Sequence, residues 1–233
     1  MEIKRYKSGN EALVALTETL IGLINAKGTE LFHLSISGGD TPKNLFRLWV
    51  DQYKEKIDWQ RLRFYWVDER CVPPEDPESN YGQAKQLLFD PLNIPPAHVY
   101  RMRGEADPEE EAKRYATMLH ERVPEVNGLP RFDCIMLGVG GDMHTASIFP
   151  GNLALLTVKE AVTTATHPVS GQRRVTLTGP VLLNDVPLLV PVIGPTKAPV
   201  VNALAKGLDE NNPTPSAYVV SKATSATVIT DVQ

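Results

Sequence analysis

Apolar residues along this chain alternate between helical spacing and short uninterrupted runs of the kind that form buried strands. Ser8 stands three residues before Glu11, as in a capping box, and leucine and isoleucine then recur at helical intervals, so a first helix is predicted there. Further helices are predicted over residues 42–53, 80–92, 108–123 and 196–207. Strands are predicted over residues 31–37, 63–68, 99–102, 132–137, 173–179, 187–194, 217–221 and 226–230.

The order of these elements places most of the helices between strands. Strands that alternate with helices are typical of an α/β fold, in which a mostly parallel sheet is covered by helices on both faces. The 233 residues are enough for a substantial core, and no internal repeat or linker interrupts them. A single domain over residues 1–233 is therefore predicted.

Composition and net charge limit the kinds of binding partner that this chain is expected to have, and they indicate its cellular compartment. A formal net charge of −4 argues against a protein that coats nucleic acid, although local cations can still hold a small anion. Cys71 and Cys134 are too few and too far apart for a zinc site or a disulfide framework, which favours a reducing compartment. The sequence has neither a signal peptide nor an apolar stretch of about 18 residues, so a cytoplasmic protein is expected.

Several common catalytic and cofactor motifs are absent from the sequence. It has no GxxxxGKS or GxxxxGKT nucleotide loop, no HExxH metal motif and no GxSxG serine elbow. Gly138 and Gly140 begin a GxGxxG pattern, but Met143 stands where the third glycine of a dinucleotide fingerprint belongs. The five histidines show no metal-ligand spacing, so they predict no metal site.

Two loops that follow predicted strands carry residues suited to binding. In "SGGDTP" (37–42), glycines expose backbone N–H groups, hydroxyls add donors, and the positive dipole end of a helix follows at once. This loop is predicted as a phosphate cradle, and a plain tight turn is the alternative. In "VDERCVPPEDPESN" (67–80), three consecutive charges follow a strand and indicate either contact with a polar ligand or a solvated loop.

The stretch "LGVGGDMHTASIFPG" (137–151) places an acid and a histidine inside a glycine-rich loop, with a possible helix start at 145–149. In extended backbone, Asp142 and His144 point to the same side, so the carboxylate can fix the imidazole tautomer while the imidazole activates water. A structural histidine is the alternative. Arg174 heads a strand and Lys197 precedes a helix, so each is either a phosphate ligand or an ordinary surface charge.

Together, "SGGDTP", "DERCVP" followed by "SN", "GVGGDMHTASIFPG", "RVTLT" and "GPTKA" resemble the motifs of the 6-phosphogluconolactonases, in that family's order and across essentially the whole chain. The resemblance implies a three-layer α/β/α fold with a mostly parallel, Rossmann-like sheet. It also implies hydrolysis of 6-phosphoglucono-δ-lactone to 6-phosphogluconate, in the oxidative pentose phosphate pathway, without cofactor or metal. The implied partner is this small substrate, with no nucleic acid and no membrane, and the motifs indicate no oligomeric state.

The resemblance also assigns roles position by position. His144 matches the catalytic histidine of the family, Asp142 the acid beside it, and Arg70 the arginine of the DER motif that faces the substrate. Phosphate-binding positions of the family match Ser37, Gly38, Gly39, Thr41, Arg174 and Lys197. The usual Asp-Gly-His of the family reads Asp-Met-His here, so a positive φ at Met143 would cost roughly 1 kcal/mol or more in strain.

In the implied mechanism, His144 acts as general base toward water, and Arg70 or loop N–H groups stabilise the oxyanion. Two other functions remain open. The glucosamine-6-phosphate deaminases share "SGGDTP" and "GPTKA" but typically carry Asp-Glu-Tyr where Arg70 stands and Ile-Ala-Phe in place of residues 145–147 here. The second alternative function is that of a protein that binds sugar phosphates without catalysing a reaction. The intact Asp142 and His144 argue against this alternative.

Overall fold

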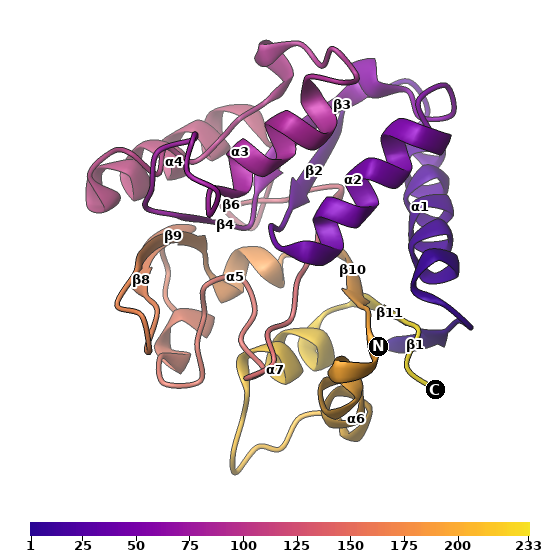
Figure 1. The fold of residues 1–233 in the computed structure, drawn as a ribbon. Coiled ribbons are helices and arrows are strands. Elements are labelled where there is room, and N and C mark those ends of the chain that lie inside the picture. Colours follow the sequence, from indigo (N-terminus) through magenta and orange to yellow (C-terminus); the bar gives the residue numbers. More distant parts are fainter.

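A six-stranded sheet forms the centre of the computed structural model, which describes all residues from 1 to 233 (Figure 1). All of its strands pair in parallel, so the predicted α/β class with a mostly parallel sheet is confirmed. In order across the sheet, the strands are β1 (Glu2–Arg5), β11 (Ser225–Thr230), β10 (Pro187–Val192), β7 (Cys134–Met136), β2 (Phe32–Ile36) and β3 (Leu62–Trp66).

Helices cover both faces of this sheet and complete the three expected layers. α1 (Gly9–Ala26) and α2 (Asp40–Gln52) lie on one side of the sheet, and α4 (Pro108–Arg122) lies on the other (Figure 1). The remaining helices are α3 (Asn80–Ala84), which runs on into a π-helical turn at Lys85–Phe89, α5 (Gly179–Leu182), α6 (Ala198–Lys206) and α7 (Pro215–Lys222). None of them has the length and apolar character that a bilayer span requires.

The direction of the strand order changes between β2 and β7. From β2 the chain continues through α2 to β3 on one side, and from β7 it continues to β10 on the other. In open parallel sheets, a ligand crevice forms outside the carboxyl ends of the strands at such a point. Ser37 ties these two strand ends together, because its hydroxyl donates to the Met136 carbonyl (2.9 Å) and accepts from the Gly138 N–H (3.1 Å).

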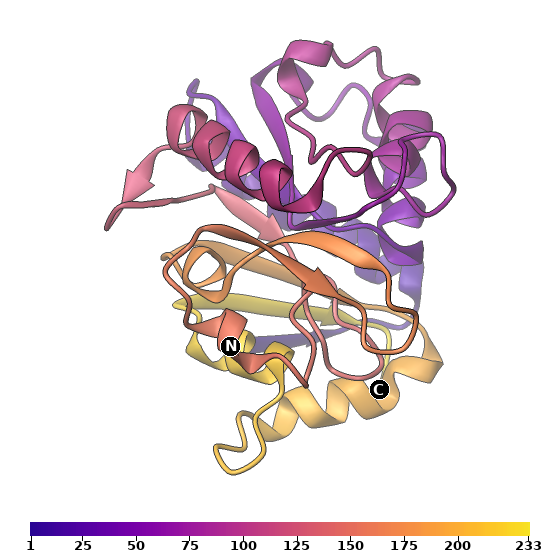
Figure 2. The same ribbon diagram turned by 90° about the vertical axis from the view of Figure 1, so that its left-hand side faces the viewer.

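A smaller antiparallel sheet stands beside the main one, in the order β4 (Asp68–Arg70), β9 (Arg173–Leu177) and β8 (Val162–Thr166). Figure 2 shows β8 and β9 toward the viewer, with α4 above them. A short hairpin, β5 (Glu125–Val126) and β6 (Leu129–Pro130), follows α4. The charged run at 68–70 is thus a strand and not a solvated loop, and its pairing sets Arg70 directly opposite Arg174.

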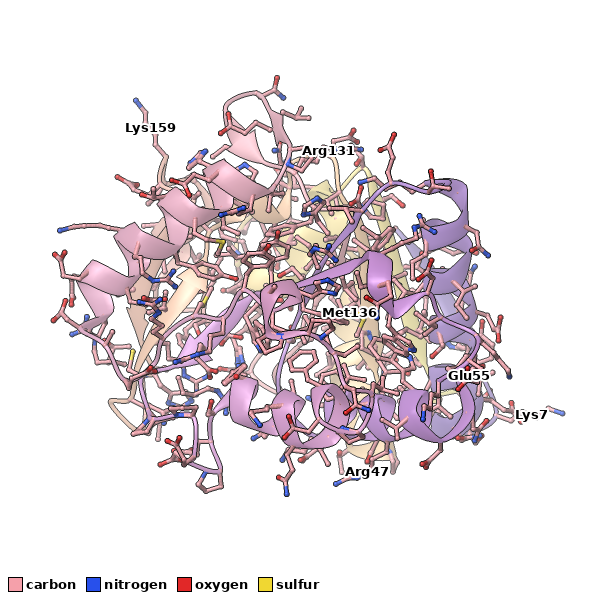
Figure 3. The ribbon with its side chains drawn as sticks, turned by 90° about the horizontal axis from the view of Figure 1, so that it is seen from above. Lys7, Arg47, Glu55, Arg131, Met136 and Lys159 are labelled. Carbon is pink, nitrogen blue, oxygen red and sulfur yellow. The ribbon has the colours of Figure 1, made fainter.

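One contiguous cluster of 62 buried hydrophobic residues packs the sheet against the helices. Every residue of β2 and β7 is buried, as expected for strands covered on both faces. Figure 3 shows Met136 of β7 in the interior, while the charged side chains of Lys7, Arg47, Glu55 and Lys159 project outward.

Three predictions of local structure are wrong. Residues 217–221 belong to α7 and not to a strand, because Pro215 suits the first helical turn and core packing outweighs the strand preference of valine and tyrosine. Residues 145–149 form a turn and not a helix start, since Ala146 has a φ of 50°. Residues 99–102, predicted as a strand, do not form one. Only Val99, which follows a short 3₁₀ turn, pairs with another strand, through a single parallel bridge to Phe64.

Candidate active site

A cavity of about 390 Å³ opens at the carboxyl ends of β2 and β7, next to the paired strands β4 and β9. All but one of the residues predicted from the sequence line it: Ser37, Gly38, Gly39, Thr41, Arg70, His144, Arg174 and Lys197. The exception is Asp142, which contacts His144 from outside the cavity. Side chains from distant parts of the sequence therefore meet in one place.

His144 and Asp142 form a hydrogen-bonded pair. Asp142 Oδ1 lies 2.5 Å from His144 Nδ1 and also accepts from the His144 backbone N–H at 3.2 Å. Partial burial opposes ionisation of Asp142, but these hydrogen bonds outweigh it and hold the pKa of the carboxyl below its usual value. A carboxylate can only accept, so the hydrogen in this bond belongs to His144 Nδ1, which in the neutral imidazole leaves the lone pair on Nε2.

Gly140 has no side chain, and the Asp142–His144 pair occupies the space that a side chain there would fill. A β-carbon at position 140 would lie 2.1 Å from His144 Nδ1 and 2.6 Å from Asp142 Oδ1. At the neighbouring Gly141, nothing lies within 4 Å of such an atom. In the sequence, Gly140 stands out only as part of an incomplete dinucleotide motif, whereas in the structure it is the residue that lets the pair form.

The predicted phosphate cradle is the turn between β2 and α2. Gly39 has a φ of 105°, which residues with a side chain rarely adopt. The single hydrogen of the Ser37 hydroxyl goes to the Met136 carbonyl, so that hydrogen is not free for a ligand. Behind this turn, the 13 residues of α2 add a positive dipole end.

Arg70 and Arg174 lie side by side on paired strands. Arg70 Nη1 donates to the Glu78 carbonyl (2.6 Å), and Arg174 Nη2 donates to Gln172 Oε1 (3.1 Å). Burial lowers the pKa of Arg174, and the Asp68 carboxylate, 3.6 Å from its Nη1, opposes that shift. The buried Nε of each guanidinium has no hydrogen-bond partner in the protein, so each arginine has donor capacity that the protein does not use.

Lys197 reaches the same cavity from a third part of the chain. It ends a short 3₁₀ turn, Pro195–Lys197, and its Nζ donates to the Val139 carbonyl at 2.8 Å. An ammonium group has three hydrogens, so two remain for a ligand. Because Arg174 and Lys197 both line the cavity, they are not isolated surface charges.

Comparison with known proteins places the chain in a family. The family described as Glucosamine-6-phosphate isomerases/6-phosphogluconolactonase matches residues 7–229. A 6-phosphogluconolactonase of Treponema pallidum is 42 % identical over 179 residues, which cover 77 % of this chain and 74 % of that protein. The chain belongs to the 6-phosphogluconolactonase family. A second member, from Haemophilus influenzae, is 42 % identical over 82 % of this chain and 80 % of its own.

A solved structure shares the fold of this chain. The crystal structure of a protein called devB is 38 % identical and has a TM-score of 0.89, with 98 % of this chain and 95 % of that chain covered. The fold, the family and the enzyme class expected from the motifs, a lactone hydrolase, are confirmed. The roles of the individual side chains stay predictions.

Met143 occupies the position where the 6-phosphogluconolactonase family usually has glycine. Its φ is 67°, in the left-handed region, so the condition for backbone strain is met. Two contacts hold this conformation. The Met143 carbonyl accepts from the N–H of Ser216 in the first turn of α7 (3.1 Å), and the Met143 side chain packs against the hydrophobic core.

We expect Met143→Gly to be more stable than Met143→Ala by ~1 kcal/mol. Both variants lose the packing of methionine, and glycine alone enters the left-handed region without steric cost. Urea unfolding of the two variants measures the difference, with the wild-type protein as reference. Equal stability of the two would show that the backbone at this position is not strained.

Two buried polar residues that line the cavity, Asp68 and Asn80, were not predicted as site residues from the sequence. Asp68 is buried beside Arg174 and accepts from Ser147 Oγ at 2.6 Å. Asn80 is 2 % exposed, donates to the Asp68 carbonyl (2.9 Å), and keeps an Oδ1 without a partner. A β-carbon on Gly38 would lie 1.8 Å from that oxygen, so the Asn80 side chain fits there only because residue 38 is glycine. The "DER" and "SN" motifs contain both residues and were the available signal.

Glu69, the middle residue of the DER motif, supports the loop and does not line the cavity. Its carboxylate accepts from the backbone N–H groups of Arg70 (2.8 Å), Asn80 (2.8 Å) and Tyr81 (2.7 Å). Burial raises the pKa of Glu69 to about 7, against the effect of these hydrogen bonds. Glu69 thus fixes the backbone that carries Arg70 and Asn80 into the site.

Proposed function

We propose that this protein hydrolyses 6-phosphoglucono-δ-lactone to 6-phosphogluconate, with His144 as the general base. The observation that carries the proposal is the Asp142–His144 pair beside a cavity that also holds Arg70, Arg174 and Lys197. A base and several cations in one cavity suit a substrate with a reactive carbonyl at one end and a phosphate at the other. The names of the relatives support the same substrate.

His144 begins the reaction as a base. Its Nε2 takes a proton from water, and the resulting hydroxide attacks the carbonyl carbon of the lactone. The tetrahedral oxyanion that forms accepts hydrogen bonds from Arg70 or from loop N–H groups. On collapse, the bond from this carbon to the ring oxygen breaks, and His144 returns its proton to that oxygen. Asp142 stabilises the imidazolium between the two steps.

The phosphate of the substrate binds away from the reacting carbonyl. It carries about two negative charges at neutral pH. Arg174, Lys197 and the backbone N–H groups of Gly38, Gly39 and Thr41 are its proposed ligands. Binding energy from this remote group orients the lactone toward His144, and it therefore supports the rate at the other end of the substrate.

The direct test follows the lactone itself, generated in situ from glucose-6-phosphate by its dehydrogenase. We expect the lactone to decay faster with the protein than without it, and we expect no ammonia from glucosamine-6-phosphate. The second expectation rests on Arg70 and Thr145–Ser147, where this chain departs from the deaminase pattern. Ammonia release at a comparable rate would overturn the assignment, and inactivity in both assays would favour a sugar-phosphate-binding protein.

Arg174→Ala and Lys197→Ala should each weaken the binding of 6-phosphogluconate about tenfold, because each removes a charge-assisted contact worth ~1.5 kcal/mol or more. Competitive inhibition of lactone hydrolysis by this product measures the effect. Lys159→Ala is the matched control, since Lys159 is exposed and lies outside the cavity. Inhibition that stays unchanged in both cavity variants would mean that the phosphate binds elsewhere.

A further inference from the structure

The β8–β9 hairpin and the segment 71–79 meet through one side chain, that of Gln172. Its amide oxygen accepts from Arg174 Nη2 (3.1 Å), and its amide nitrogen donates to Glu78 Oε2 (2.9 Å). The backbone carbonyl of Glu78 in turn accepts from Arg70 Nη1 (2.6 Å). A continuous series of hydrogen bonds therefore connects the two guanidinium groups that line the cavity.

The chemistry of an amide fits this place. Arg174 can only donate and the Glu78 carboxylate can only accept, so the side chain between them must do both. Glutamate at position 172 would set a second carboxylate against Glu78, and leucine would supply neither contact. The backbone of Gln172 is fixed independently, because its carbonyl accepts from the His167 N–H (2.9 Å) and closes the hairpin. A change of this side chain therefore leaves the hairpin closure in place.

We propose that Gln172 is a positioning residue that sets the placement of Arg174 relative to Arg70, and thereby how tightly the cavity holds the phosphate end of the substrate. The inference rests on the proposed function, in which Arg174 binds phosphate. Neither Gln172 nor Glu78 lines the cavity, so both act through the arginines. Without Gln172, the nearest polar partner that remains for Arg174 is the Asp68 carboxylate at 3.6 Å, so the guanidinium is held less firmly in the position that Gln172 gives it.

Loss of Gln172 should change affinity more than turnover. The Asp142–His144 pair makes its hydrogen bonds within its own loop and has none to the hairpin. In Gln172→Leu, we expect the KM for the lactone and the Kd for 6-phosphogluconate to rise about three- to tenfold, the range of one lost hydrogen bond. We expect kcat to stay within about twofold, because Gln172→Leu keeps the other proposed phosphate ligands and leaves the Asp142–His144 pair in place.

The experiment compares Gln172→Leu with Glu78→Ala, Glu78→Gln and a control. Calorimetric titration with 6-phosphogluconate gives the Kd, lactone decay gives kcat and KM, and thermal unfolding gives the Tm. Glu78→Ala should weaken binding, whereas Glu78→Gln keeps an acceptor for Gln172 and should restore it. Gln86→Leu removes an exposed glutamine outside the site and should bind like the wild type. The double variant Gln172→Leu/Glu78→Ala should bind no more weakly than Gln172→Leu, since both changes break the same connection.

The outcomes separate this inference from the proposed function. Wild-type affinity in Gln172→Leu, with or without a lowered Tm, would overturn the positioning role and leave the hydrolysis intact. A wild-type protein that binds 6-phosphogluconate without accelerating lactone decay would overturn the hydrolysis, and weaker binding by Gln172→Leu would still support the positioning role. A wild-type protein that does not bind 6-phosphogluconate would overturn both.

Discussion

We expect His144→Asn to lower kcat for lactone hydrolysis by ~10²–10⁴, the usual range for a lost general base. Asparagine has a similar size and can still hydrogen-bond to Asp142, but its amide nitrogen takes no proton from water near neutral pH. The affinity for 6-phosphogluconate should change little, because the proposed phosphate ligands come from other loops. Rates of lactone decay and the inhibition constant of the product measure the two quantities separately.

The pH dependence of the wild-type protein provides an independent check. Its kcat should fall on acidification, because a protonated imidazole has no lone pair for the proton of water. The pKa of Asp142 is lowered, so its carboxylate stays ionised well below neutral pH and does not cause this fall. Spontaneous lactone opening speeds up with pH and has to be subtracted. If His144→Asn retains wild-type turnover after this subtraction, His144 is a structural residue.

Gly140→Ala should lower kcat about 100-fold, the effect expected when a catalytic group is displaced by about 1 Å. The new β-carbon would lie 2.1 Å from His144 Nδ1, so the imidazole and the Asp142 carboxylate cannot keep their present positions. The Kd for 6-phosphogluconate should stay near that of the wild type, since the cradle and the cations are untouched. Lactone decay and product titration measure the two effects.

Gly141→Ala is the matched control for this prediction. It adds the same methyl group one residue further along the same loop, where nothing lies within 4 Å. We expect it to keep wild-type kcat. Equal loss of activity in the two variants would point to a general disturbance of the loop, and full activity in Gly140→Ala would mean that the pair in its present geometry is not needed.

The central strands are the part of the fold that the sequence predicts best. Strands such as β7 and β10 are covered on both faces, so they appear as apolar runs whose composition alone indicates burial. By contrast, β1 reads "EIKR" and becomes a strand because β11 is available to pair with it. α7 shows the opposite conflict, since its valines and tyrosine suit a strand and its packing makes a helix.

Motifs predicted residues that line the cavity but not the relations between them. The sequence gives no sign that Arg70 and Arg174 pair directly across two strands, because that register depends on the antiparallel sheet as a whole. The hydroxyl of Ser37 looks available in "SGGDTP", yet its hydrogen is already bound to Met136. Likewise, the space at Gly140 is defined only once His144 has folded back beside it. Residue types are local information, whereas hydrogen-bond partners depend on the folded chain.

The two outer strands of the main sheet have features that disfavour pairing with another copy of the molecule. β1 is short and carries acidic and basic side chains, which disfavour the addition of a strand from another molecule. At the other edge, Val99 bridges to Phe64 of β3, and the Tyr100 N–H donates to the Phe64 carbonyl at 2.8 Å. This single bridge occupies backbone groups that would otherwise be open to pairing. Both edge strands therefore disfavour the addition of a strand from another molecule. This matters for a sheet of such apolar strands, because open edges favour aggregation.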